Sequence, residues 1–405
     1  MDFSLSERSQ DYLVRVQAFM EEEILPIEDD YFRELKALDN AWVVLPIITT
    51  LKEKAKAQGL WNMFLPVAGY GPALSNTEYA PVAEQTGRSF IAPEIFNCNA
   101  PDTGNMEVLV HYGSEEQKER WLTPLLEGTI RSAFCMTEPE VASSDATNMA
   151  ATALIEGDEV VLNGRKWWST GIGHPDCQVV IFMGLTNPEA HRHQRHSMVL
   201  VPKNTPGVKV ERMLSVFGDL DEPYGHGEVS FTDVRLPKSA IIAGPGRGFE
   251  VAQGRLGPGR IHHCMRMIGA AERALALLIK RALSREAFGD SLANLGGNRD
   301  IIANARMAIE QARLLTLKAA WTLDNKGIRA AMSDVSQIKV VAPNMLQTIV
   351  DQAIQIHGGA GMCEDFPLTQ MLAYARCLRL ADGPDEVHRL LVSKFELGKY
   401  RELMN

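Results

Sequence analysis

Asp382 is the residue in this chain that most directly suggests chemistry. It lies in the stretch LRLADGPDEVHR, residues 378–389. A carboxylate that follows an apolar run and precedes a glycine can project from the end of a helix into a closed pocket. Burial there would raise its pKa and would suit it to abstract a weakly acidic proton. The same pattern also describes an ordinary surface acid beside a helix C-cap, so Asp382 is a candidate base that other segments must support.

Two central segments combine hydroxyl groups with a large flat side chain. Residues 134–139 (FCMTEP) precede the pair Ser143 and Ser144, and residues 166–171 are KWWSTG. Hydroxyls and backbone N–H groups can bind a heteroaromatic ring edge or a phosphate, and an indole can pack against a flavin. A capped turn and a core tryptophan are the alternative interpretations.

Two later segments carry residues that suit a dinucleotide. In residues 285–289 (REAFG), Arg285 could hold a pyrophosphate and Phe288 could pack on an adenine. In residues 355–361 (QIHGGAG), glycines would let the backbone approach a ligand closely. A solvated arginine with a C-cap glycine, and a plain loop, are the alternatives.

Three zones of different periodicity position these segments. Residues 1–130 read as helices joined by loops, with a capping box at Ser114-Glu115-Glu116-Gln117 that opens a helix closed by Pro124 and Gly128. Residues 131–246 alternate as strands, and residues 247–405 return to helical spacing that predicts an antiparallel bundle. We therefore expect a multi-domain α+β protein with these three domains.

Within the middle zone, the pattern predicts consecutive hairpins that turn at Gly157-Asp158 and at Asn163-Gly164. Further strands are expected at residues 179–183, 197–202, 208–210 and 228–231. No strand–helix alternation supports a parallel sheet, which disfavours a nicotinamide-binding Rossmann domain.

Composition restricts the partners. The net charge of −10 disfavours nucleic acid, which needs a basic face. The six cysteines are scattered and indicate free thiols in a reducing compartment, and no metal site is expected. The chain has neither a signal-peptide pattern at its start nor an apolar run of about 18 residues, so we expect a cytoplasmic protein without membrane insertion.

Taken together, the four segments and the acid resemble the acyl-CoA dehydrogenase family of flavoproteins over nearly the whole chain. Residues 113–125 also resemble the family's N-terminal helical signature. Residues 257–266 (GPGRIHHCMR) and 381–388 (ADGPDEVH) resemble the branch that in animals is fused to a phosphotransferase-like domain, which this sequence lacks. The resemblance implies an N-terminal helical domain, a middle β-barrel or β-sandwich domain and a C-terminal four-helix bundle.

The resemblance also assigns roles to individual residues. It implies Asp382 as the catalytic base and Ser144, Arg260 and Gly383 as substrate-binding residues. The implied FAD-binding residues are Phe134, Met136, Thr137, Ser143, Ser144, Trp168, Ser169, Thr170, Arg285, Phe288, Gln355, Gly358 and Gly359.

The implied reaction is α,β-dehydrogenation of an acyl-CoA thioester to the trans-2-enoyl-CoA, as in fatty-acid β-oxidation. Asp382 takes the α-proton, and the β-hydride goes to flavin N5. An electron-transferring flavoprotein is the expected acceptor. Because the FAD site of the family spans subunits, a homotetramer built as a dimer of dimers is expected. The alternatives are a relative that acts on 4-hydroxy or 4-phosphorylated acyl-CoAs and a flavin-binding partner without turnover.

Some positions depart from the family pattern. The usual base is Glu, and the shorter Asp382 retracts the carboxylate by roughly one C–C bond, about 1.5 Å. Some relatives carry the base just before the arginine that matches Arg260, but Gly259 occupies that position here. One inserted residue leaves open which of Ser143 and Ser144 contacts the flavin.

Three groups of histidines have more than one possible role each. Either His262 or His263 could face the active site or serve packing. His388 is interpreted as structural, with tuning of Asp382 as the alternative. Residues 190–196 (AHRHQRH) are interpreted as a solvated loop rather than a metal site.

Overall fold

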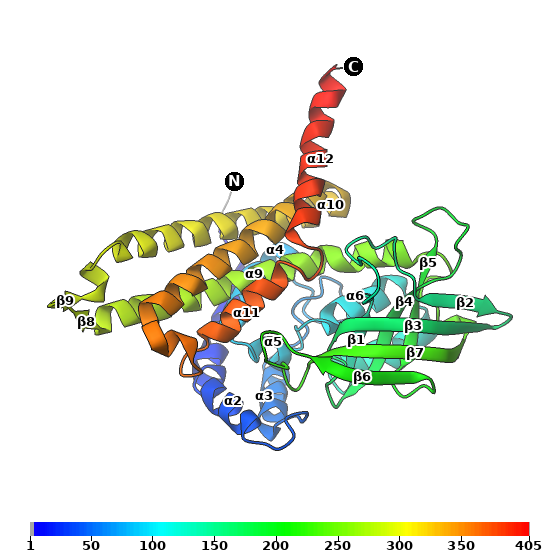
Figure 1. Cartoon of the computed structure of the whole chain (residues 1–405), viewed down its shortest axis with the longest axis horizontal. Helices are drawn as coiled ribbons and strands as arrows, with labels where there is room; N and C mark the ends of the chain where they lie inside the picture. The colour runs from blue at the N-terminus through cyan, green and yellow to red at the C-terminus, as the bar shows by residue number, and fades with distance from the viewer. Residues whose placement is uncertain (1–3, 405) are drawn as a thin grey trace. The chain divides into compact units, whose positions relative to one another are not determined.

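The computed structural model describes residues 4–404 (Figure 1). The expectations made for the chain ends at Met1–Phe3 and Asn405 lie outside the described residues. The chain separates into two compact units: unit 1 contains residues 1–28, 73–93 and 260–405, and unit 2 contains residues 29–72 and 94–259.

Unit 1 is helical. Its elements before residue 260 are α1 (Glu7–Phe19), the π-helical turn η1 (Met20–Ile24) and α4 (Asn76–Thr86). Helix α9 (Gly248–Ser284) enters unit 1 at residue 260 and is followed by β8 (Glu286–Ala287), β9 (Asp290–Ser291), η4 (Leu292–Asn294), α10 (Asn298–His357), η5 (Gly358–Met362), α11 (Leu368–Leu378) and α12 (Asp385–Met404).

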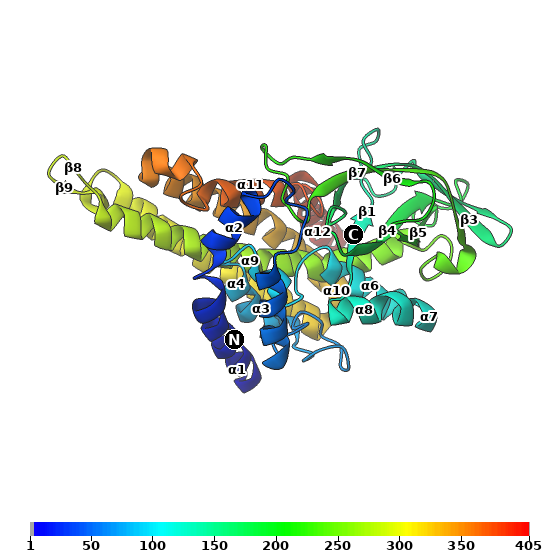
Figure 2. The ribbon, with the colours of Figure 1, turned by 90° about the horizontal axis from the view of Figure 1, so that it is seen from below.

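The long element α10 is two helices. Gly327 has φ 76° and ψ 174° inside it, a conformation that glycine adopts readily and that reverses the chain there. The two arms of α10 lie beside α9 and α11 (Figures 1 and 2). The predicted antiparallel four-helix bundle is confirmed.

Unit 2 joins helices to a sheet. Its helices are α2 (Glu28–Lys36), α3 (Pro46–Ala57), α5 (Ala92–Ile95), α6 (Asp102–Tyr112), α7 (Glu115–Gln117), the π-helical turn η2 (Lys118–Leu122), α8 (Thr123–Glu127) and the 3-10 turn η3 (Lys238–Ala240). The strands are β1 (Arg131–Cys135), β2 (Thr152–Glu156), β3 (Glu159–Thr170), β4 (Cys177–Leu185), β5 (His196–Pro202), β6 (Val208–Leu214) and β7 (His226–Pro237).

The sheet curls around a core. Its strand order is β1-β4-β2-β3-β7-β6, with β5 on β4. Phe182 on β4 and Phe231 on β7 are separated by two strands, yet their ring centroids are 4.6 Å apart. A flat sheet would separate these strands by about 14 Å. The N–H of Trp167 donates to the carbonyl of Thr137 at 2.9 Å, so β3 also joins the continuation of β1. The predicted β-barrel or β-sandwich is confirmed as a curled, nearly closed sheet.

Several local expectations hold. The capping box at Ser114 is present, with Gln117 as its reciprocal partner. β2 and β3 form the hairpin predicted at Gly157-Asp158. Gly128, in the left-handed region at φ 71°, ends the helical segment.

Two expectations are wrong, and one feature of the sheet was not predicted. Asn163-Gly164 is not a turn, because β3 continues through it with an irregular register against β7. Pro124 does not close its helix but starts α8, where a proline costs no hydrogen bond. The sheet also contains parallel pairs, β1 with β4 and β2 with β4, although no helix–strand alternation announces them.

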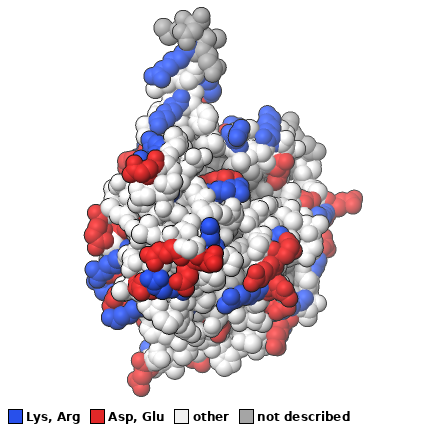
Figure 3. All heavy atoms as spheres, turned by 90° about the vertical axis from the view of Figure 1, so that its right-hand side faces the viewer, with Lys and Arg blue, Asp and Glu red and all other residues white. Residues whose placement is uncertain are grey.

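Charge and cysteines carry no strong structural signal. On the face drawn in Figure 3, basic and acidic side chains are interspersed. All six cysteines are free thiols, and four of them are buried. Among the described residues, no helix combines the length and the apolar character that crossing a bilayer requires.

Close contact between α4 and α9 generates a prediction for stability. A Cβ on Gly269 would overlap the carbonyl oxygen of Glu84, and one on Gly87 would overlap the carbonyl of Arg266. We expect Gly269→Ala to reduce the free energy of unfolding by about 1–3 kcal/mol, because backbone cannot move aside cheaply. Differential scanning calorimetry measures the loss. Gly398→Ala in α12, where no atom lies within 4 Å of the added carbon, is the matched control and should leave Tm equal or higher. An unchanged Tm in Gly269→Ala would contradict the close packing.

Candidate functional site

Asp382 lies in the turn between α11 and α12 rather than at a helix end. Its φ is 56°, in the left-handed region that residues with a side chain rarely adopt. Asp385 closes this turn with both its side chain and its backbone N–H. The Asp385 carboxylate accepts from Nε of Arg379 at 2.9 Å and from Nδ2 of Asn344 at 3.0 Å. Its N–H donates to the Arg379 carbonyl at 3.1 Å.

Two side chains hold the main chain of Asp382. Its carbonyl accepts from Nε of Arg260 at 2.9 Å and lies 3.3 Å from Nε2 of His388. A Cβ on Gly383, which has φ 102°, would lie 3.0 Å from that same nitrogen. The glycine is therefore needed both for the backbone conformation and for the approach of the imidazole.

The histidine of this pair is neutral. Burial, followed by the nearby charges of Arg260 and Lys339, lowers the pKa of His388 to about 4. Its Nε2 must carry the proton, because a carbonyl can only accept. Its Nδ1 then accepts from the Ser336 hydroxyl at 3.3 Å. The neighbourhood of Asp382 and His388 that the sequence suggested is thus a contact with the backbone of Asp382.

The carboxylate of Asp382 is partly exposed. Its side chain is 21% exposed, and Oδ2 lies 3.4 Å from Nε2 of His263. Lys339 is fully buried beneath the turn, where its ammonium donates to the Leu378 carbonyl. Burial lowers the pKa of Lys339, and the negative charge of Asp382 opposes that effect. Within unit 1, the acid is therefore partly accessible rather than enclosed, with Arg260 and Lys339 close to the turn.

In unit 2, the two central segments lie side by side. The bond between Trp167 and Thr137 joins them, and Nζ of Lys166 donates to the Met136 carbonyl at 2.9 Å. Lys166 also forms a buried ion pair with Glu138 at 2.7 Å. Glu138 accepts from the N–H groups of Ala150 and Ala151, so the segment that carries Phe134, Met136 and Thr137 is fixed.

Trp168 is displayed by a bulge in β3. The register against β7 shifts between Lys166 and Ser169, Trp168 has φ 51°, and its side chain is 40% exposed. Thr170 is half-buried and its Oγ1 lies 2.9 Å from Nδ1 of His226. Ser169 is fully buried beside Cys135, so its predicted contact with a cofactor stays a prediction.

The two serines of the following turn differ. Oγ of Ser143 accepts from the Glu138 N–H at 2.8 Å and therefore stabilises the turn itself. Ser144 is exposed. A ligand could reach Ser144 without breaking the turn, whereas Ser143 already has an internal role.

The residues predicted for the distal part of the cofactor lie at one end of unit 1. Nη2 of Arg281 donates to the His357 carbonyl at 3.3 Å, which ties the end of α9 to the turn after α10. Arg285, Gln355, Gly358 and Gly359 are exposed, and Phe288 is 100% exposed. Phe288-Gly289 is the two-residue turn of the β8–β9 hairpin rather than a helix C-cap, with both φ values positive.

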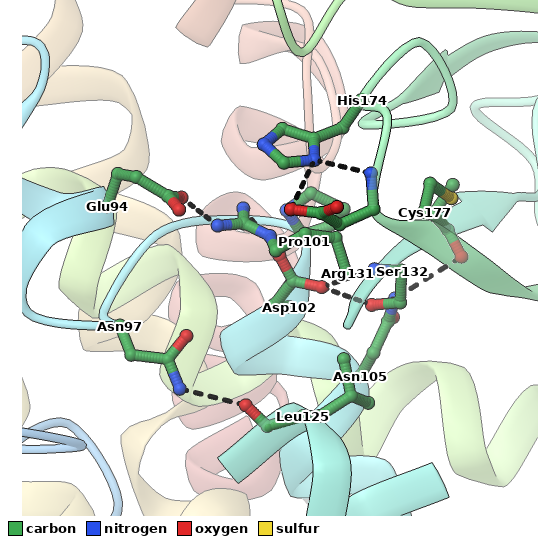
Figure 4. A network of polar contacts seen from close by, with 12 residues as sticks. Glu94, Asn97, Pro101, Asp102, Asn105, Leu125, Arg131, Ser132, His174 and Cys177 are labelled. Carbon is green, nitrogen blue, oxygen red and sulfur yellow. Dashed lines mark hydrogen bonds and ion pairs between the residues drawn. The ribbon is translucent and has the colours of Figure 1, made fainter. Parts of the chain in front are cut away.

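Buried ions anchor β1 to the helices of unit 2. Figure 4 shows Arg131 between Glu94 of α5 and Asp102 of α6. Asp102 also accepts from Ser132, yet burial raises its pKa to about 7. Removal of one partner from such a cluster typically costs about 3–5 kcal/mol. The network fixes the start of the strand that leads to Phe134.

Some residues at these places were not found from the sequence. They are Lys339, Glu138 with its partner Lys166, and Arg255, whose guanidinium carbon lies 3.9 Å from the centre of the Phe134 ring. For Lys339, a lone charge in the apolar stretch of residues 338–342 was the available signal, because a charge is rarely buried without a purpose or a partner.

The exposed groups of unit 2 suit a flat heteroaromatic ligand. Trp168 offers a partly exposed indole, Ser144 an exposed hydroxyl, and Nε1 of Trp167 is a buried donor without a hydrogen-bond partner among the described residues. At the end of unit 1, a Cβ on Gly358 or Gly359 would meet nothing within 4 Å, so the backbone there is approachable. These features fit a flavin with a dinucleotide tail. In the described part of the chain, no three His, Cys, Asp or Glu side chains are grouped to hold a metal.

Comparisons with known proteins identify the family. The N-terminal, middle and C-terminal domains of acyl-CoA dehydrogenases match residues 6–129, 133–234 and 246–397. The chain is 56% identical over 384 residues to mouse acyl-CoA dehydrogenase family member 10, covering 94% of this chain and 36% of that protein. It is 50% identical to FadE2 of Mycobacterium tuberculosis, a candidate acyl-CoA dehydrogenase, over 98% of both chains.

A solved structure of a candidate acyl-CoA dehydrogenase from Mycobacterium abscessus is 63% identical, with a TM-score of 0.96, over 98% of this chain and 100% of that one. This chain spans about half or less of the animal relatives that it matches, for example 51% of chicken acyl-CoA dehydrogenase family member 11. The chain belongs to the acyl-CoA dehydrogenase family of oxidoreductases.

Proposed function

We propose that this protein catalyses the FAD-dependent α,β-dehydrogenation of an acyl-CoA thioester, with Asp382 as the base. The observation that carries the proposal is the turn at Asp382. The carboxylate of Asp382 is partly exposed, while its carbonyl accepts a hydrogen bond from Arg260. The turn is closed by the hydrogen bond from Arg379 to the Asp385 carboxylate. A surface acid at a helix end needs none of these ties. The family relationship supports the reaction class.

Bound FAD would accept the β-hydride at N5, a step that no side chain can perform. The ring system of FAD would be held by Trp168, Phe134, Met136, Thr137, Thr170 and Ser144. Ser169 and Ser143 stay in the predicted set, although each already has an internal environment. Arg285, Phe288, Gln355, Gly358 and Gly359 would take the pyrophosphate and adenosine of FAD in a neighbouring subunit.

Asp382 would remove the proton from the α-carbon as enolate charge develops on the thioester oxygen. That oxygen needs hydrogen-bond donors to lower the barrier. Because the peptide that links Asp382 to Gly383 is planar, the two bonds to the Asp382 carbonyl also fix the direction of the Gly383 N–H. This constraint supports the predicted substrate-binding role of Gly383. Arg260 would contribute to substrate binding through its hydrogen bond to the Asp382 carbonyl and through its positive charge.

The shorter base is compatible with this site. The left-handed backbone at Asp382 redirects the side chain relative to a helix end, and Gly383 permits the turn. Near-attack geometry tolerates errors of only about 1 Å, so backbone placement can compensate for a missing methylene.

Exposed apolar side chains support a homotetramer, built as a dimer of dimers. On α12 they include Leu390 at 55% and Leu397 at 55% exposure, and at the opposite end of the bundle Phe288 and Met362 at 69%. Contiguous exposed apolar surface marks interaction sites. An electron-transferring flavoprotein is proposed as the acceptor.

Replacement of the proposed base tests the reaction. We expect Asp382→Asn to lower the rate of anaerobic flavin bleaching by an acyl-CoA at least 10³-fold while FAD stays bound, because the amide cannot take the proton. Stopped-flow absorbance across a panel of straight, branched, 4-hydroxy and 4-phosphorylated acyl-CoAs measures it and identifies the substrate class. Asp158→Asn, in the exposed β2–β3 hairpin, is the control. Normal bleaching in Asp382→Asn would exclude this base, and no bleaching of wild type by any thioester would favour a flavin-binding partner.

Phe288 tests the shared cofactor site. An aromatic side chain that is fully exposed in one subunit contributes little to that subunit's stability. We expect Phe288→Ala to weaken FAD retention about tenfold and to leave Tm of the apoprotein unchanged, because the ring would pack only in the assembly. Flavin fluorescence after gel filtration, with light scattering for mass, measures both. Phe217→Ala, at 80% exposure in unit 2, is the matched control, and equal FAD retention in both variants would contradict the interface.

A further inference from the structure

His263 lies three residues after Arg260 on α9, the spacing that places two side chains on one face of a helix. Both approach Asp382 from that face: Arg260 binds its carbonyl, and Nε2 of His263 is 3.4 Å from its carboxylate oxygen Oδ2. The His263 side chain is 15% exposed, so it is largely buried beside the acid.

The protonation of His263 follows from its other nitrogen. Nη2 of Arg266 lies 3.2 Å from Nδ1 of His263. A guanidinium can donate hydrogen bonds but cannot accept them, so Nδ1 must present its lone pair. In the neutral ring the proton then resides on Nε2, the atom nearest Asp382. Arg266 thereby turns His263 into a donor toward the carboxylate and prevents it from acting as a base there.

The other groups that face Asp382 come from three elements. Arg260 and Cys264 belong to α9, Lys339 to α10, and His388 to α12. The two cations lie behind the turn and bind main-chain carbonyls. His388 also binds the carbonyl, and burial raises the pKa of Cys264 to about 12, so that thiol is uncharged. Nε2 of His263, in contrast, faces the carboxylate itself.

We propose that His263, fixed in its Nε2–H form by Arg266, is a positioning residue that aligns the carboxylate of Asp382 for removal of the α-proton. The proposal rests on the proposed function of Asp382. A distance of 3.4 Å is longer than a good N–H···O hydrogen bond, and catalytic hydrogen bonds often tighten only when substrate binds. A side chain one methylene shorter than the family's usual base has the greater need of such alignment.

Loss of the hydrogen bond from His263 should shift the pH dependence of the rate in a defined direction. A hydrogen bond to the charged form of an acid lowers its pKa. Without it, the carboxylate holds its proton to higher pH, so the acidic limb of the rate profile should move upward by about one pH unit. Misalignment should also slow the step at pH 8, where the acid is ionised, by roughly tenfold or more.

The test is the pH profile of single-turnover flavin bleaching in holoenzyme variants. We expect His263→Ala to show both effects with FAD content and Tm near wild type, and we expect His263→Gln to restore much of the rate, because its amide can donate from the position of Nε2. His191→Ala, in the loop at residues 187–195 where residue 191 is exposed, is the histidine control. A wild-type profile in His263→Ala would overturn the proposal.

A second readout does not depend on turnover. In holoenzyme labelled with ¹⁵N-histidine, the two-bond ¹⁵N–¹H pattern should assign His263 as the neutral Nε2–H tautomer at pH 7, and Arg266→Gln should disturb that assignment. Observation of the Nδ1–H form or of an imidazolium would overturn the proposal even if His263→Ala fails to fold. A His263 effect in an enzyme whose Asp382→Asn variant still bleaches would instead refute Asp382 as the base, so the two failures are distinguishable.

Discussion

Asp382 occupies a left-handed backbone conformation, and the bonds that its carbonyl makes to Arg260 and His388 keep it there. Such a conformation costs roughly 1 kcal/mol or more for a residue with a side chain, so it persists only where neighbours enforce it. Three helices contribute: α9 supplies Arg260, α10 supplies Ser336 behind His388, and α12 supplies His388 itself. The placement of one carboxylate therefore depends on the packing of the whole bundle, including the glycine contacts between α4 and α9.

In unit 2, a strand bulge and buried ion pairs, rather than a left-handed turn, position the candidate binding residues. A regular β3 would bury or expose its residues in strict alternation, but the bulge at Trp168 interrupts the alternation and displays the indole. The bond from Trp167 to Thr137 then holds the two central segments together. Buried ions at Arg131 and at Lys166 fix the strand ends, where apolar packing alone would allow sliding.

The sequence was sufficient where local chemistry decides the structure. The capping box at Ser114, the hairpin at Gly157 and the helices of the last zone were predictable because each depends on neighbours within a few residues. Asn163-Gly164 misled because a glycine at φ 141° serves a strand irregularity as well as a turn. At Phe288-Gly289 the sequence allowed a helix C-cap, but the structure has a hairpin turn. A glycine after a helix suits both structures.

The rest of the site depends on contacts between distant residues, which periodicity does not reveal. His263, Lys339 and Asp385 surround the turn at Asp382 from separate helices, and no local pattern announces that they meet. Spacing alone could have marked His263, because it shares a helix face with Arg260. The identity of its partner could not be predicted.

Solvent exchange at the α-carbon tests the role of Asp382 most directly, because it isolates proton transfer from hydride transfer. The holoenzyme would be incubated in D₂O with an acyl-CoA analogue that carries sulfur at the β-position and cannot release a hydride, and deuterium uptake would be followed by mass spectrometry. The account predicts exchange by wild type and none above background by Asp382→Asn. Equal exchange by both proteins would show that another group removes the proton and would contradict the account.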